Sequence, residues 1–119
     1  MHKNTGRVAF FALIGLLAVP ITFSQTATTE LSGTVYDNTG AVLPGAMVGA
    51  VNEATGVTIK LLTNGAGMYA FPSMTVGKYT INVELPGFKT ARRQGVNLVV
   101  GTPIREDITL ELGDTREVV

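Results

Sequence analysis

Residues 63–85 read TNGAGMYAFPSMTVGKYTINVEL, and this stretch decides the fold. Over Lys78–Glu84 apolar and polar residues alternate strictly, which is the period of a β-strand with one buried face. That face carries Tyr79, Ile81 and Val83. Upstream, Asn64–Gly67 combines an asparagine with two glycines, and these residue types favour a turn because they accept local side-chain bonds and positive φ. The stretch therefore predicts β-strands separated by tight turns.

Short β-rich runs continue in both directions from this stretch, with turns at spacings of roughly 8 to 12 residues, which is typical of a β-sandwich. We expect strands at residues 30–36, 46–52, 57–63, 68–71, 78–84, 89–94, 96–100 and 104–112, with a loop over Pro72–Gly77. No stretch of about ten residues after Gln25 has a helical period free of glycine or proline. The prediction is an all-β fold: a seven- to eight-stranded antiparallel β-sandwich of the prealbumin or Ig type over residues 30–112, with a frayed tail at 113–119.

The first 24 residues have the pattern of a secretory signal peptide. Lys3 and Arg7 precede an apolar run over residues 8–19, and no acidic residue occurs before Glu30. A run of this length suits a signal peptide and is short for a bilayer-spanning helix of about 20 residues. The pattern therefore predicts export, to the periplasm and outer membrane or to the medium.

Cleavage is expected before Gln25, because Thr22 and Ser24 place small side chains at the −3 and −1 positions. Residues 25–29 are then a short linker, and a retained N-terminal anchor is the alternative. The single histidine, His2, lies before the cleavage point, and the chain has no cysteine. These absences exclude a histidine-dependent triad, a histidine zinc site, a thiol nucleophile and a disulfide from the exported chain.

Charge gives no reason to expect a nucleic-acid partner. Nine basic and nine acidic residues cancel, and the one basic cluster, Arg92 and Arg93 with Lys89 nearby, has no interleaved aromatic residues. We interpret this cluster as a charged, solvated edge strand. Glu106 and Asp107 are adjacent, so on a strand they point to opposite faces and cannot act as a paired acid and base. The sequence therefore predicts that the chain is not an enzyme and holds no cofactor or metal.

Seven short motifs occur in order across the predicted sandwich. They are GTVYD at 33–37, LPGAMV at 43–48, TN at 63–64, GMYAF at 67–71, VGKYTINV at 76–83, PGF at 86–88 and ITL at 108–110. In this order and spacing the chain resembles the carboxypeptidase regulatory-like domains, over nearly all of the predicted exported chain. The motif positions with an expected structural role are Gly33, Asp37, Gly67, Tyr69, Phe71, Gly77, Tyr79 and Gly87.

The resemblance implies a transthyretin-like β-sandwich, also described as a carbohydrate-binding-like fold. In its details the chain is similar to the first domain of Oar-like TonB-dependent outer-membrane receptors. This implies a non-catalytic binding or scaffold module whose partner is the receptor plug and barrel, or another periplasmic or extracellular protein. No membrane span is expected in the exported chain. The alternatives are a carbohydrate-binding module, with a polysaccharide as its ligand, and an accessory domain of a metallocarboxypeptidase.

Two candidate contact sites follow from side chains that face away from the expected core or depart from the family pattern. The first is an apolar partner surface, which we expect to be formed by Met47, Val51, Ile59 and Leu61. The second is Tyr36, an aromatic residue on the expected outer face of the first strand and the one candidate for stacking on a sugar. The Asp37–Gly40 turn lacks the alternating oxygen ligands of a calcium loop, so a calcium site is not expected there.

Overall fold

The computed structural model describes residue 15 and residues 26–113. In this part of the chain there are eight strands and no helix: β1 (Thr28–Asp37), β2 (Met47–Asn52), β3 (Thr58–Leu62), β4 (Met68–Thr75), β5 (Gly77–Glu84), β6 (Ala91–Leu98), β7 (Ile104–Arg105) and β8 (Ile108–Leu110). The predicted signal peptide, apart from Gly15, and the predicted tail, apart from Gly113, lie outside the described residues.

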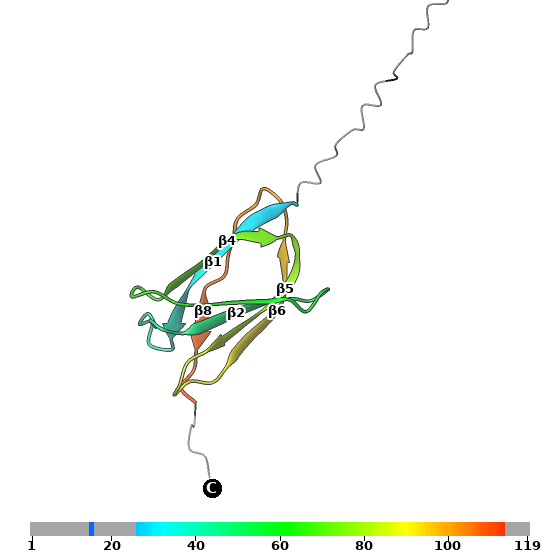
Figure 1. Cartoon of the computed structure of the whole chain (residues 1–119). Helices are drawn as coiled ribbons and strands as arrows, with labels where there is room; N and C mark the ends of the chain where they lie inside the picture. The colour runs from blue at the N-terminus through cyan, green and yellow to red at the C-terminus, as the bar shows by residue number, and fades with distance from the viewer. Residues whose placement is uncertain (1–14, 16–25, 114–119) are drawn as a thin grey trace, which may run out of the picture.

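The strands form two four-stranded sheets that pack face to face (Figure 1). In the first sheet, β1 lies between β4 on one side and β7 and β8 on the other, and the second sheet has the order β3-β2-β5-β6. The prediction of an all-β sandwich is confirmed. One detail differs from a wholly antiparallel arrangement: β7 and β8 pair with β1 in parallel.

The core lies between the inner faces of the two sheets. The alternating face predicted for β5 is buried, and so are the two aromatic side chains of β4, whose rings meet edge to face with centroids 6.0 Å apart. The apolar core residues are Leu31, Val35, Ala46, Val48, Ala50, Tyr69, Phe71, Met74, Tyr79, Ile81, Val83, Val96, Leu98, Ile108 and Leu110. Each sheet therefore contributes the period-2 row that its strands show in sequence.

The predicted loop over Pro72–Gly77 is wrong, because β4 continues through it to Thr75. Pairing moves from Leu31 opposite Phe71 to Thr29 opposite Met74, so β4 holds one more residue than β1 in this interval. This β-bulge shifts the alternation by one residue and turns Met74 into the core, where it is 1% exposed. Because β4 is an edge strand, the proline removes no ladder bond on its outer side.

The two strands predicted at 89–94 and 96–100 form one strand, β6. Tyr79 is opposite Val96 and Ile81 is opposite Arg93, so β6 also contains a bulge. Gly95 lies in the bulge with φ of 72°, a backbone conformation that glycine adopts without a Cβ penalty. The glycine therefore marks a bulge within one strand rather than a break between two.

Candidate functional site

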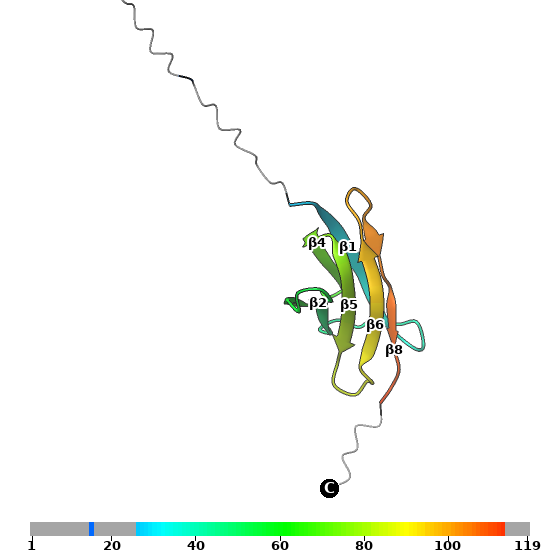
Figure 2. The same ribbon diagram turned by 90° about the vertical axis from the view of Figure 1, so that its right-hand side faces the viewer.

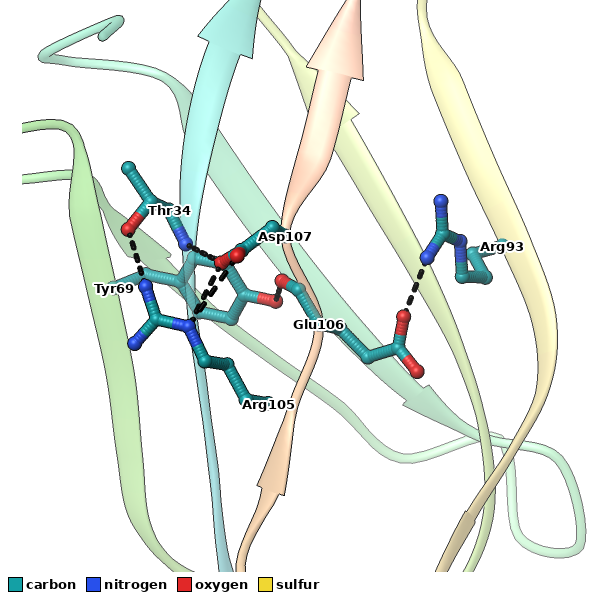
Figure 3. A network of polar contacts seen from close by, with 6 residues as sticks. All are labelled: Thr34, Tyr69, Arg93, Arg105, Glu106 and Asp107. Atoms are coloured by element: carbon teal, nitrogen blue, oxygen red, sulfur yellow. Dashed lines mark hydrogen bonds and ion pairs between the residues drawn. The ribbon is translucent and has the colours of Figure 1, made fainter.

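The strand predicted at 104–112 is divided into β7 and β8 by Glu106 and Asp107, which anchor a polar network (Figure 3). The Tyr69 hydroxyl on β4 reaches across β1 and donates a hydrogen bond of 2.5 Å to the backbone carbonyl of Glu106. It passes Gly33, which has no side chain to block the approach. We call Gly33, Tyr69 and Glu106 the clasp, because together they hold the C-terminal strands against β1.

Burial raises the pKa of Tyr69 well above its ordinary value, and the nearby charges of Glu106 and Asp107 raise it further. The hydroxyl therefore keeps its proton and remains a donor across the physiological pH range. Its role in the clasp accounts for the motif tyrosine at this position as a structural residue.

The Glu106 side chain closes one side of the sandwich. Its carboxylate pairs with the Arg93 guanidinium of β6 at 2.5 Å, which joins the two sheets where β6 and β8 lie beside each other (Figure 2). Arg93 lies directly opposite the buried Ile81 and so shares its inward face, and an inward-pointing charge is a known way to protect a sheet edge. The interpretation of the basic cluster as a charged edge strand fits this position, because β6 is the last strand of its sheet.

Asp107 turns the other way. Its carboxylate accepts a hydrogen bond of 2.9 Å from the backbone N–H of Thr34, and Arg105 pairs with the same carboxylate and with the Thr34 hydroxyl. Figure 3 shows the two adjacent acids bonded to different partners, as the sequence predicts for neighbouring residues in extended backbone. The pair fixes the strand break and does not converge on a shared space.

The outer face of the second sheet carries a shallow recess of about 240 Å³ centred on Gly49, which we call the Gly49 recess. Its lining consists of Met47, Gly49, Val51, Thr58, Lys60, Asn82 and Glu84. Met47 and Val51 lie along β2 on either side of the glycine, so the recess has an apolar axis with polar side chains on β3 and β5. It is a small open site that a side chain or a single sugar ring would fill.

The four residues of the predicted partner surface do not lie on one face. Met47 and Val51 face outward in the Gly49 recess, whereas Ile59 is opposite Ala50 and Leu61 is opposite Val48, both of which are buried. Residues directly opposite each other in an antiparallel pair share a face, so Ile59 and Leu61 lie on the inner side of β3. The structure therefore brings these residues together in two pairs, not in one patch.

Beside the Gly49 recess, Glu53 ties the β2–β3 turn to the bulge of β6. Its carboxylate accepts hydrogen bonds from the backbone N–H of Gly95 at 3.1 Å and from the Thr80 hydroxyl at 3.0 Å. Both bonds lower the pKa of Glu53 below its ordinary value, and the bond from Gly95 has the larger effect. The Glu53 carboxylate is therefore ionised and is held by hydrogen bonds within the fold.

Asp37 closes the turn that follows β1. One carboxylate oxygen accepts hydrogen bonds from the Thr39 N–H, the Thr39 hydroxyl and the Ala41 N–H, at 2.8, 2.6 and 3.0 Å. Such a local side-chain cap explains the motif aspartate without a calcium ion. Residues 26–113 contain no group of three or more His, Cys, Asp or Glu side chains placed to hold a metal.

This cap makes a testable contribution to acid stability. The Thr39 hydroxyl bond, followed by smaller backbone contributions, lowers the pKa of Asp37 from its ordinary 3.8. A lowered folded-state pKa stabilises the protein above the unfolded value, and this stability is lost as the pH falls through the folded value. The denaturation midpoint of Asp37→Ala should thus lie below wild type at neutral pH and approach it as the pH falls past 3.8, measured by circular dichroism. A difference that does not change with pH would contradict the assignment.

Tyr36, the candidate sugar contact, is half-buried at the end of β1. It forms a bridge with Val42 and lies opposite Thr109 of β8. An aromatic residue that binds a sugar presents one open face; Tyr36 is held in the sheet by pairing on both sides and is partly exposed, so its contact with a sugar stays a prediction. Among the other motif glycines, Gly67 and Gly87 lie in turns and Gly77 begins β5.

Sequence reasoning missed a groove of about 270 Å³ on the side of the sandwich opposite the Arg93–Glu106 pair. Its lining comes from the end of β2, the β2–β3 turn, β3, β4 and β5: Asn52, Thr55, Val57, Ile59, Ser73, Thr75 and Tyr79. We call this the β3–β4 seam. The alternating apolar residues at 57, 59 and 61 indicate one wall of this groove. The opposite wall is formed by β4, and the expected loop over Pro72–Gly77 placed no strand there.

No helix in the described part of the chain has the length and apolarity needed to cross a membrane. No curated protein matches this chain. Solved structures match it at the level of the fold, and the three described next have identities under 25%.

Catechol 1,2-dioxygenase from Acinetobacter sp. ADP1, inhibited by bound mercury, superposes with a TM-score of 0.63 at 12% identity, covering 76% of this chain and 54% of that one. A type II cohesin–X-dockerin complex from Acetivibrio cellulolyticus superposes with a TM-score of 0.58 at 20% identity, covering 72% and 59%. The Bacillus anthracis TIE protein superposes with a TM-score of 0.57 at 15% identity, covering 72% of this chain and 17% of that one. This chain thus spans less than two thirds of each of these structures, and the likeness shows the fold alone.

The family model of the carboxypeptidase regulatory-like domain matches residues 30–111, which are nearly all of the β-sandwich. Within this range lie the buried motif aromatics Tyr69, Phe71 and Tyr79 and the capped Asp37 turn. The chain belongs to the carboxypeptidase regulatory-like domain family.

Proposed function

We propose that this chain is an exported, non-catalytic binding or scaffold module. The observation that carries the proposal is the use of its acidic side chains. Asp37, Glu53, Glu106 and Asp107 each accept hydrogen bonds or pair with cations that stabilise turns, bulges or strand breaks. A general acid or base must reach a substrate, and these four carboxylates are held by the fold itself. We therefore propose that the module acts by binding a partner through its sheet faces and edges.

We further propose that the module serves as the N-terminal periplasmic domain of a TonB-dependent receptor in outer-membrane transport. The support is the signal-peptide pattern of residues 1–24 together with the Oar-like form of the family motifs. Its partner is then the receptor's own plug and barrel, or another periplasmic or extracellular protein. The Gly49 recess, with Met47 and Val51 on either side of the glycine, offers such a partner a small apolar contact.

Export is tested by fusing the chain to a reporter enzyme that is active only outside the cytoplasm of a diderm bacterial host. We expect reporter activity and a processed product whose first residue is Gln25. A Leu17→Glu variant places a charge in the apolar run and should abolish both, while Asn4→Ser outside the run should change neither. Reporter activity that survives Leu17→Glu would overturn the proposed signal.

The receptor context is tested separately with an antibody raised against the sandwich. In fractionated cells that express the native gene, we expect a band several times larger than this chain in the outer-membrane fraction. A band of the size of the sandwich alone, in the periplasm or the medium, would overturn the receptor role and leave the exported module standing. A cytoplasmic product would overturn both.

A further inference from the structure

The edges of the two sheets are protected unequally. The β4 edge contains Pro72 and a bulge, and the β6 edge contains the Gly95 bulge and the inward Arg93. The β7–β8 edge consists of two very short strands interrupted at Glu106. Proline, bulges, inward charges and short length are the devices that stop a sheet edge from pairing with another strand. Three edges of this sandwich therefore resist pairing.

The fourth edge, on β3, is protected only by one lysine and by its length of five residues, and it has no bulge and no inward charge. Its register with β2 runs without a shift from Val51 opposite Thr58 to Met47 opposite Leu62. It contains no proline, and four of its five residues are exposed. Val57 and Ile59, which face the β3–β4 seam, are 60% and 44% exposed. β3 is therefore a regular edge strand with an apolar inner row and little protection against pairing.

The hydrogen-bond pattern shows which backbone groups of β3 are free. Asn52 N–H donates to the Val57 carbonyl, and Thr63 N–H donates to the Ala46 carbonyl. Hydrogen-bonded pairs alternate along an antiparallel ladder, so the odd-numbered residues of β3 are bonded to β2. The N–H and C=O groups of the even-numbered residues, Thr58, Lys60 and Leu62, therefore point away from the sheet and are available to a further strand.

The β3 edge is self-complementary. Antiparallel pairing of two copies with Ile59 opposite its own counterpart places Val57 opposite Leu61 of the other copy, so the inner row is wholly apolar. In the same register Lys60 is opposite Thr58, and no two lysines face each other. A register centred on Lys60 would oppose like charges, so the charge pattern favours Ile59 over Lys60 as the centre, and the register centred on Ile59 also pairs the inner apolar row from Val57 to Leu61 in full.

We propose that two copies of this chain associate through their β3 edges, antiparallel and centred on Ile59, to form one continuous eight-stranded sheet. The contact is a short strand from each copy, so the association is weak and depends on concentration. It covers Val57 and Ile59, which are exposed in the single chain, and extends the β3–β4 seam across both copies.

The register is tested by cysteine cross-linking, because the chain has no cysteine of its own. In Ile59→Cys the two thiols lie opposite each other in a non-hydrogen-bonded pair, at a separation that a disulfide spans. In the matched control Val57→Cys they are four residues apart along the strand, which is too far. The purified protein from the whole reading frame should give a disulfide-linked dimer with Ile59→Cys at least ten times faster than with Val57→Cys.

A second variant tests the edge itself. Lys60→Pro removes an N–H that points away from β2, so the single chain keeps its ladder while the added strand loses a bond. We expect the wild-type sedimentation coefficient to rise with concentration, and the rise to disappear in Lys60→Pro. Cross-linking of Ile59→Cys should likewise disappear in the double variant.

The proposal is overturned if wild type stays monomeric at all concentrations and Ile59→Cys cross-links no faster than Val57→Cys. It is also overturned if Ile59→Cys is captured by a different protein in preference to its own copy, since the edge would then serve a heterologous strand. If Lys60→Pro fails to fold, as judged by circular dichroism, the comparison of the two cysteine variants still decides the question.

Discussion

Gly33→Ala should lower the free energy of unfolding by about 3 kcal/mol. A Cβ at this position would overlap the carbonyl oxygen of Glu106 and come within 2.7 Å of the Tyr69 hydroxyl. Neither atom can retreat freely, because the two are bonded to each other across β1. The cost combines overpacking, typically about 1–3 kcal/mol, with the loss of a partly buried hydrogen bond. Urea denaturation followed by far-ultraviolet circular dichroism measures it, since the chain has no tryptophan.

Gly49→Ala is the matched control, because it is also a glycine-to-alanine change within a strand. A Cβ at Gly49 meets nothing nearer than the Lys60 side chain at 3.7 Å. Alanine is better than glycine in a strand interior, so this variant should be more stable by about 0.5 kcal/mol. Opposite signs at the two glycines are the expected result. Equal effects would mean that the clasp does not restrict position 33.

Met74→Asp should destabilise the sandwich by about 4 kcal/mol. The side chain is 1% exposed in the core, so an aspartate there is a buried charge without a partner. The adjacent Ser73→Asp is the control, because Ser73 is exposed at the β3–β4 seam and should change stability by less than about 0.5 kcal/mol. If residues 72–77 were a loop, as the sequence suggests, the two variants would behave alike. Thermal denaturation of the pair distinguishes the two outcomes.

The sandwich follows from the sequence wherever period-2 alternation is unbroken. Tyr79, Ile81 and Val83 of β5 are the clearest case, since one face is apolar and the other polar, and the structure buries the apolar face. Prediction failed where a bulge shifts the alternation. At Pro72 and at Gly95 the residue types indicate a turn, and only pairing with the neighbouring strand shows that the strand continues.

The candidate surfaces were less predictable, for a related reason. The faces of β2 and β3 can each be read from sequence, but which face of one adjoins which face of the other is set by register. From sequence we therefore expected Met47, Val51, Ile59 and Leu61 on one face. In the structure Ile59 is opposite Ala50 and Leu61 is opposite Val48, which places Ile59 and Leu61 on the inner side. The clasp is also invisible in sequence, because Tyr69 and Glu106 are separated by 37 residues.

The parallel pairing of β1 with the last two strands has a mechanical consequence. Because these neighbours run in the same direction, Thr28 and Leu110 lie toward opposite poles of the sandwich (Figure 2). A pull applied between these poles slides the first and last strands past each other along their own axes. Their hydrogen bonds then bear the load together instead of opening one by one, and the Tyr69 bond to Glu106 lies across the direction of slip. The sandwich thus resists tension along its length most strongly at the pairing of β1 with β7 and β8.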